Sequence, residues 1–138
     1  VYKGLCRSGY QKDEPILIFN IDTFRPDFTY PEFVTDFDVM GYLETFIGSG
    51  SNWSNVVPDR TQPEQVALTA EKQNLSEYCC TGLYYWRSAE QYCELFKEYS
   101  QKAPDAMQGS EYYIAPMYNM LIEKGSSTFW SLKEVLDK

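Results

Sequence analysis

Histidine is absent from the 138 residues of the sequence. Its absence excludes Ser-His-Asp and Cys-His nucleophile systems, histidine ligation of zinc and imidazole acid-base catalysis. The reactive side chains that remain are carboxylates, amines and thiols. We therefore expect any chemistry to depend on carboxylates, lysine or a metal ion bound by oxygen atoms.

Long apolar runs and clusters of positive charge are also missing. No run approaches the ~20 residues of a membrane-spanning helix, and no charged-then-apolar signal segment opens the sequence. The formal net charge is -8 with no run of Lys or Arg, whereas nonspecific nucleic-acid binding needs basic patches. We expect neither a membrane nor a nucleic-acid partner. Phosphorylated metabolites remain possible ligands, because a few cations and a divalent metal can override net charge locally.

The four cysteines form no C-x-x-C pair. Cys79 and Cys80 cannot readily bridge to each other within a strand, because a disulfide requires a specific separation of the two Cα atoms. We interpret all four as reduced, small apolar residues, as in a protein of the cytoplasm.

The composition predicts a folded chain. Hydrophobic residues make up 43% of the sequence and aromatic residues 17%, which is enough for one packed core at this length. The sequence opens at Val1 without an initiator Met, inside a segment predicted as a helix that ends at Gly9. We expect residues 1–138 to form a portion of a single domain of a longer protein.

Residues 15–22 form a continuous apolar run closed by Asp22. Such a run is typical of a strand at the centre of a parallel sheet, covered on both faces. Asp22 is then at the carboxyl end of the strand, the edge where open α/β sheets bind ligands. If neighbouring strands are missing, an apolar edge or face is expected to be exposed or covered by a second copy in a homo-oligomer.

The rest of the chain is predicted as strands and helices. Strands are expected at 40–47, 53–57, 65–72, 79–86 and 127–132, with a hairpin-like turn at 48–51. A helix capped by Ser88 carries an apolar stripe to Tyr99, and a second helix begins at Pro116 and ends before Gly125. Residues 23–38, rich in Pro, Asp and aromatic residues, are predicted as an active-site loop with a short helical turn.

Four segments carry a resemblance to a known family. In chain order they are Ile18-Phe19-Asn20-Ile21-Asp22-Thr23, Thr69-Ala70-Glu71-Lys72, Thr81-Gly82-Leu83-Tyr84-Tyr85 and Glu111-Tyr112-Tyr113-Ile114-Ala115-Pro116-Met117-Tyr118-Asn119. Together they resemble the sugar-phosphate nucleotidyltransferases typified by glucose-1-phosphate thymidylyl- and cytidylyltransferases, most closely the capsule polysaccharide branch. The resemblance spans about residues 1–125. It implies an α/β fold with a Rossmann-like mixed sheet flanked by helices, of which this chain is the carboxy-terminal portion.

The resemblance also implies site residues. Asp22 is expected to hold a Mg2+ ion and Lys72 to bind the substrate phosphate, both in catalysis. The implied substrate-binding residues are Asn20, Glu71, Thr81, Gly82, Glu111 and Asn119. The residue types suit these roles, because Mg2+ prefers oxygen ligands and an ammonium can neutralise phosphoryl oxygens while a neighbouring carboxylate accepts from sugar hydroxyls.

From the residues alone, each assignment has a structural alternative. Asp22 can cap a turn or a helix, and a Glu-Lys pair at a strand end can be an exposed surface pair of little energetic value. Gly82 can mark a bulge rather than the close approach of a ligand. Glu111 suits a helix start because the helix dipole favours an acid there.

The sequence has no counterpart of the Gly-rich loop that cradles the nucleotide in this family, and no late Asp matches its second metal ligand. The function expected is part of an enzyme that transfers a nucleoside monophosphate from NTP to a sugar 1-phosphate or similar phosphate ester. The NTP site would lie largely on a missing amino-terminal half. The alternatives are a non-catalytic sugar-phosphate-binding module and an interaction domain that uses the aromatic loop from Phe24 to Phe37.

Overall fold

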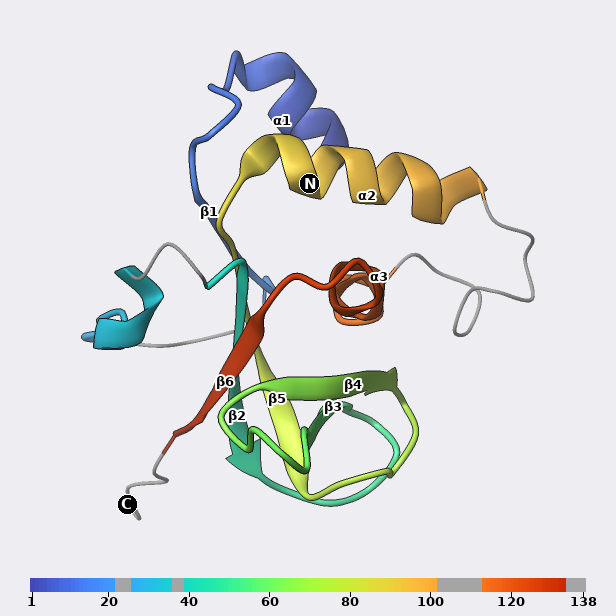
Figure 1. Ribbon diagram of the computed structural model, residues 1–138. Helices are drawn as coiled ribbons and strands as arrows, with labels where there is room; N and C mark the ends of the chain where they lie inside the picture. The colour runs from blue at the N-terminus through green and yellow to red at the C-terminus, as the bar shows by residue number, and fades with distance from the viewer. Residues whose placement is uncertain (22–25, 36–38, 102–112, 134–138) are drawn as a thin grey trace.

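The computed structural model describes residues 1–21, 26–35, 39–101 and 113–133 (Figure 1). Its helical elements are α1 (Tyr2–Ser8), α2 (Ala89–Gln101), α3 (Met117–Glu123) and the 3-10 turn η1 (Glu32–Thr35). Its strands are β1 (Ile16–Phe19), β2 (Gly41–Ile47), β3 (Ser54–Pro58), β4 (Val66–Glu71), β5 (Tyr78–Trp86) and β6 (Thr128–Leu132). Most predicted elements are present, and the α/β class is confirmed.

The strands form one mixed sheet with the order β4-β3-β5-β2-β6. β6 runs parallel to β2, whereas β5 is antiparallel to β1, β2 and β3. β5 pairs with three other strands. It pairs with β2, its second half pairs with β1, and Cys79 near its start pairs with Asn55 of β3. Gly82 separates the two halves with φ 100°, in a stretch where the register of β2 and β5 shifts as it does at a β-bulge.

The prediction for residues 15–22 is correct for a strand but wrong for its position. β1 is shorter, lies antiparallel to β5, and buries only Ile18 fully. Among the residues that the structure describes, β1 pairs with β5 alone, and Phe19 and Ile21 beyond it are exposed. A continuous apolar run therefore marks an edge of this sheet, the exposed apolar edge that the sequence led us to expect.

The prediction of a hairpin-like turn at 48–51 is also wrong. β2 and β3 do not pair with each other, because β5 lies between them. The chain instead turns back after Gly48, whose N–H donates to the carbonyl oxygen of Glu77 at 2.9 Å. The ring of Trp53 then packs edge-on against Phe46, with centroids 5.0 Å apart.

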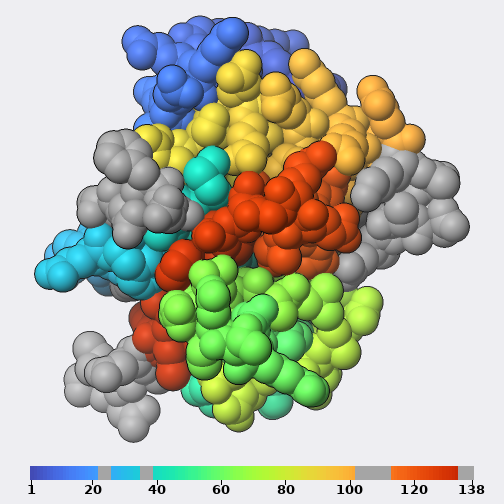
Figure 2. All heavy atoms as spheres, viewed as in Figure 1, coloured from blue at the N-terminus to red at the C-terminus, as the bar shows by residue number. Residues whose placement is uncertain are grey.

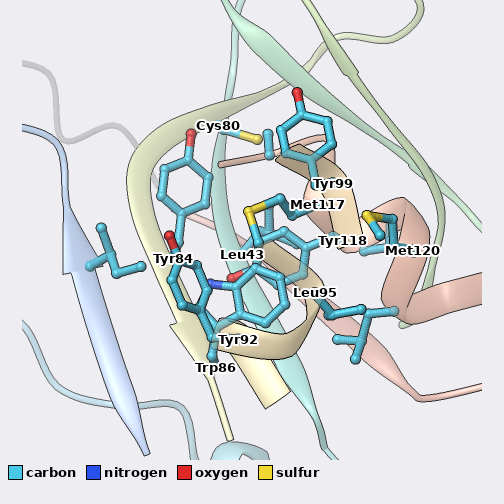
Figure 3. Close-up of a cluster of buried hydrophobic side chains, with 14 of the residues drawn as sticks. Leu43, Cys80, Tyr84, Trp86, Tyr92, Leu95, Tyr99, Met117, Tyr118 and Met120 are labelled. Atoms are coloured by element: carbon cyan, nitrogen blue, oxygen red, sulfur yellow. The ribbon is translucent and has the colours of Figure 1, made fainter. Parts of the chain in front are cut away.

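Helices cover one face of the sheet, and aromatic side chains fill the space between (Figures 1 and 3). Trp86 stacks on Tyr118 of α3 with ring centroids 4.0 Å apart, and lies edge-on to Tyr92 of α2 at 5.3 Å. The Tyr118 hydroxyl donates to the carbonyl oxygen of Tyr85 at 2.7 Å. On the surface, α3 and the segment toward β6 fill the space between α2 and the β3–β4 pair (Figure 2).

The opposite face carries a smaller apolar cluster. Its buried members are Val34, Val39, Tyr42, Leu83 and Tyr85. Phe33 of η1 packs on this face, with ring centroids 5.6 Å from Tyr42 and 5.5 Å from Phe129. The described part of the predicted aromatic loop therefore covers the sheet, with the short helical turn that was expected. Phe24 and Phe37, at the ends of that loop, lie outside the described residues, so the predicted interaction surface stays a prediction.

The helix ends follow the sequence signals. Ser88 Oγ accepts the N–H of Gln91 at 3.2 Å, which is the predicted cap of α2, and donates to the carbonyl oxygen of Lys12 at 3.0 Å. α1 ends at Gly9 with φ 70°, and α3 begins after Pro116 with φ -62°. None of the described helices has the length and apolar character to cross a membrane.

Gly41 provides a test of this packing. A Cβ on Gly41 would lie 2.8 Å from Tyr118 Cε1, and the Tyr118 ring is held by Trp86 and Tyr85. We expect Gly41→Ala to lower the free energy of unfolding by about 1–3 kcal/mol, measured by urea denaturation.

The matched control is Gly4→Ala in the exposed helix α1, where the added Cβ meets nothing within 4 Å apart from its chain neighbours and the backbone of its own helix. That change should leave stability equal or raise it by up to ~1 kcal/mol, because alanine is the better helix former. Equal effects of the two substitutions would contradict the close contact at Gly41.

Candidate functional site

The end of β4 carries the predicted Glu-Lys pair in two different environments. Glu71 is buried, and its Oε2 accepts a short hydrogen bond from the hydroxyl of Ser54, its cross-strand neighbour on β3. Lys72 leaves the strand exposed, in a left-handed conformation with φ 55°, and its N–H donates to the carbonyl oxygen of Trp53 at 3.1 Å. Residues other than glycine keep such a conformation only where surrounding contacts enforce it, often at functional sites.

The side chain of Lys72 reaches the segment that precedes α3. Its Nζ donates to the hydroxyl of Tyr113 at 3.1 Å and lies 5.2 Å from the centre of the Tyr113 ring. This contact joins the strand end to residues of the predicted Glu111–Asn119 motif. Lys72 is thus directed toward a second element rather than along the sheet.

Asn119 connects α3 to the outer strand of the sheet. Its Oδ1 accepts the N–H of Thr69 at 2.7 Å, and its Nδ2 donates to the carbonyl oxygen of Thr69 at 2.9 Å. The hydroxyl of Thr69 donates to the carbonyl oxygen of Ala115 at 2.7 Å. Asn119 therefore takes the place of a neighbouring strand at the open edge of β4. Its role as a substrate-binding residue stays a prediction.

Tyr84, in the middle of β5, links two predicted substrate-binding residues. Burial raises the pKa of the Tyr84 hydroxyl well above its usual value, and the nearby Cys80 and Glu71 raise it further. Hydrogen bonds with the side chains of Ser54 and Asn20 act on this pKa in the opposite direction. Asn20, Ser54 and Glu71 thus all lie near enough to one neutral hydroxyl to act on its pKa.

Thr81 and Gly82 occupy different surroundings. The Thr81 hydroxyl donates to Oε1 of the buried Glu44 at 3.0 Å. Because Cys80 faces the helices and successive strand residues alternate, Thr81 points to the opposite face. The carbonyl oxygen of Gly82 accepts the N–H of Asn20 at 2.8 Å, so the bulge also extends the β1–β5 pairing.

The structure therefore brings Asn20 and Glu71 together, with Lys72 beside Glu71, and separates Thr81 from them. Asp22 and Glu111 lie outside the described residues, so the predicted closeness of Asp22 and Lys72 stays a prediction. Sequence reasoning missed Ser54, Tyr84 and Tyr113. Tyr84 and Tyr113 were within the quoted motifs, whereas only the strand pairing reveals Ser54 as a neighbour of Glu71.

No group of three or more Asp, Glu, Cys or His side chains is placed to hold a metal within the described ranges. The polar groups around Tyr84 are a carboxamide, a hydroxyl and a carboxylate. Their oxygen atoms are the type of ligand that Mg2+ prefers. The Mg2+ ion, with Asp22 as its expected ligand, stays a prediction.

The fold, a six-stranded mixed sheet with helices on one face, matches that of nucleotidyltransferase-like proteins of known structure. The chain is similar to the nucleoside-diphosphate-sugar pyrophosphorylase from Vibrio cholerae RC9, with 40% identity and a TM-score of 0.84. The match covers 95% of this chain and 53% of that protein, so the chain spans about half the length of this relative.

Two more distant structures share the fold. A Bacillus anthracis protein described as a glucose-1-phosphate thymidylyltransferase, in complex with sucrose, is 15% identical with a TM-score of 0.55. The match covers 75% of this chain and 39% of the Bacillus anthracis protein. The inositol-1-phosphate CTP transferase from T. maritima is 10% identical with a TM-score of 0.51, over 71% and 37%. No protein-family model and no curated protein matches the chain.

The recognition made from the sequence is confirmed: the chain covers part of a protein of the sugar-phosphate nucleotidyltransferase family. The structural neighbours are a pyrophosphorylase, a thymidylyltransferase and a CTP transferase, all of the nucleotidyltransferase type.

The Asn119 contacts can be tested by mutation. Asn119→Ala removes both hydrogen bonds to the backbone of Thr69 and leaves its N–H and C=O without them, so we expect the free energy of unfolding to fall by about 1–3 kcal/mol. Urea denaturation measures the change, and Asn52→Ala at an exposed position is the control. Unchanged stability in Asn119→Ala would show that these bonds do not hold α3 to β4.

The cysteines provide a test of burial around Glu71. All four are free thiols, with Cys6 exposed and the other three buried. Burial raises the pKa of Cys79, and burial together with Glu71 raises the pKa of Cys80. A raised pKa keeps both thiols protonated and unreactive at about pH 8, and unfolding returns them to the ordinary value. Iodoacetamide should therefore label Cys6 in the folded protein and the others only in urea, as read by peptide mass spectrometry. Rapid labelling of Cys80 in the folded protein would contradict this.

Proposed function

We propose that the complete protein containing this chain transfers a nucleoside monophosphate from an NTP to a sugar 1-phosphate or a similar phosphate ester. The main support is the Glu71–Lys72 strand end, held beside Asn20 and Tyr84, in a chain 40% identical to a nucleoside-diphosphate-sugar pyrophosphorylase. In the reaction, an oxygen of the acceptor phosphate forms a bond to the α-phosphorus of the NTP. The bond between the α-phosphorus and the bridging oxygen breaks, and pyrophosphate leaves.

The chain's own residues would position the acceptor. Lys72 would donate to the acceptor phosphate, and Glu71, with one oxygen bound to Ser54, would accept from a sugar hydroxyl. Asn20, Gly82, Glu111 and Asn119 are proposed as further substrate contacts, whereas Thr81 faces away from them toward Glu44. Positioning and charge stabilisation supply most of the rate in phosphoryl transfer, so no imidazole or protein nucleophile is needed.

A Mg2+ ion is proposed at Asp22. When bound, such an ion neutralises phosphate charge and orients the reacting groups. We also propose that the NTP site lies largely on an amino-terminal half, beyond the residues of this chain. The exposed edge of β1 supports this, because an exposed apolar strand edge is normally covered by a neighbour. In a homo-oligomer, a second copy of the chain would cover that edge in place of the amino-terminal half.

The proposed setting is the cytoplasm, where NTP is available and free thiols persist, and the proposed use is the supply of nucleotide sugar for capsule polysaccharide. A second candidate is a non-catalytic module that binds sugar phosphate. One observation favours it: the described residues cover both faces of the sheet around β2 and β5.

Release of pyrophosphate from a panel of NTPs and sugar phosphates with Mg2+ tests the enzyme proposal. Asp22→Asn removes the charge that would hold the metal and keeps the shape, so turnover should fall by about a hundredfold or more with folding intact. Lys72→Ala should raise the KM of the sugar phosphate by about tenfold or more and change the KM of the NTP less, because a hydrogen bond to a charged group is lost.

Asp13→Asn and Lys97→Ala, both at exposed positions, are the matched controls. Thermal unfolding checks that each variant folds. Wild-type turnover and affinity in both site variants would reject the proposed site. Sugar-phosphate binding without pyrophosphate release in the wild type would favour the non-catalytic module.

A further inference from the structure

The contact between Lys72 and Tyr113 points to a second anion donor at the site. Lys72 Nζ donates to the Tyr113 hydroxyl at 3.1 Å and lies 5.2 Å from the centre of the Tyr113 ring. We infer that Tyr113 binds the phosphoryl group of the acceptor together with Lys72, by donating its hydroxyl hydrogen to an oxygen of that group. The inference rests on the proposed function and adds a substrate-binding residue to it.

The direction of the hydrogen bond carries the chemical argument. An ammonium group has three hydrogens and no acceptor, so in this contact the hydroxyl oxygen of Tyr113 must accept. The phenol then keeps its own hydrogen for another acceptor. The ammonium group also polarises that O–H, because donors in a chain of hydrogen bonds strengthen one another. A phosphoryl oxygen near Lys72 is a suitable acceptor for this hydrogen.

Both partners of the pair are fixed by contacts that do not involve a ligand. The left-handed backbone at Lys72 is held by its N–H bond to the carbonyl oxygen of Trp53. The segment after Tyr113 is held by the bond from Thr69 to the carbonyl oxygen of Ala115 and by Asn119. Two donors anchored to a strand end and a helix start are preorganised, so binding loses little freedom on their side.

The substitutions that test the inference separate the hydroxyl from the ring. Tyr113→Phe removes only the hydroxyl and keeps the ring. Lys72→Met removes the charge with similar chain length. Tyr30→Phe is the matched control, because Tyr30 is 48% exposed and its ring packs on Tyr85, on the other face of the sheet. Thermal unfolding of the complete protein checks that each variant folds.

Binding of inorganic phosphate and of glucose 1-phosphate to the complete protein is measured by phosphorus NMR titration. Tyr113→Phe should weaken both by about tenfold, because the lost bond is to a charged phosphoryl group. The double variant should bind more weakly than Lys72→Met alone, since Tyr113 donates in its own right. Tyr30→Phe should bind as the wild type does.

Three results would overturn the inference and leave the proposed function standing. The first is unchanged binding in Tyr113→Phe together with weakened binding in Lys72→Met. The second is that Tyr113→Phe weakens binding of glucose 1-phosphate but not of inorganic phosphate, and the third is that the double variant binds no more weakly than Lys72→Met. Unchanged binding in Lys72→Met as well would count against the proposed function itself.

Discussion

Asn119 gives the outer edge of β4 the hydrogen bonds that a further strand would otherwise make. Hydrophobic packing of α3 on the sheet is not directional, so by itself it would allow the helix to slide along β4. Hydrogen bonds to the N–H and the C=O of one residue, Thr69, remove that freedom. Because Thr69 lies on the strand that ends at Glu71, the position of α3 is fixed relative to Glu71 and Lys72.

The topology of β5 explains how distant segments meet in the candidate site. The strand is long enough to pair with β3 near its start and with β1 near its end, and the irregularity at Gly82 lies between them. Tyr84 lies just beyond Gly82, near Asn20, which directly follows β1, and near Ser54 of β3. Two strands on the same side of β5 thus supply groups to a single buried hydroxyl.

Local signals in the sequence predicted most elements, and long-range pairing explains where they failed. The stripe from Tyr92 to Tyr99 and the Ser88 cap place α2 correctly, because helix periodicity and capping are local properties. The Gly-rich turn at 48–51 suggests a hairpin, yet nothing within it encodes the insertion of β5. Likewise the apolar run of β1 indicates a buried strand, while its exposure depends on which strands surround it.

The same distinction applies to the site. The motif resemblance singled out Glu71 and Asn20, and the structure brings them together, whereas Thr81 faces the other side through a bond to Glu44. The contribution of Ser54 depends on strand register and that of Tyr113 on the position of α3. Neither of these can be read from residue types or spacing, because both arise from contacts between segments far apart in the chain.

The acidic character of the chain sets a limit on how it binds phosphate. The net charge is -8, but charges farther away than the ~8 Å Debye length of physiological salt are largely screened, so the donors next to the ligand decide its affinity. A second lysine beside Lys72 would repel it and lower its tendency to stay protonated. A hydroxyl donor such as Tyr113 adds a hydrogen bond without that repulsion, and its oxygen holds the ammonium group in place meanwhile. A pair made of one cation and one neutral donor is therefore a consistent way to bind a phosphate on this acidic surface.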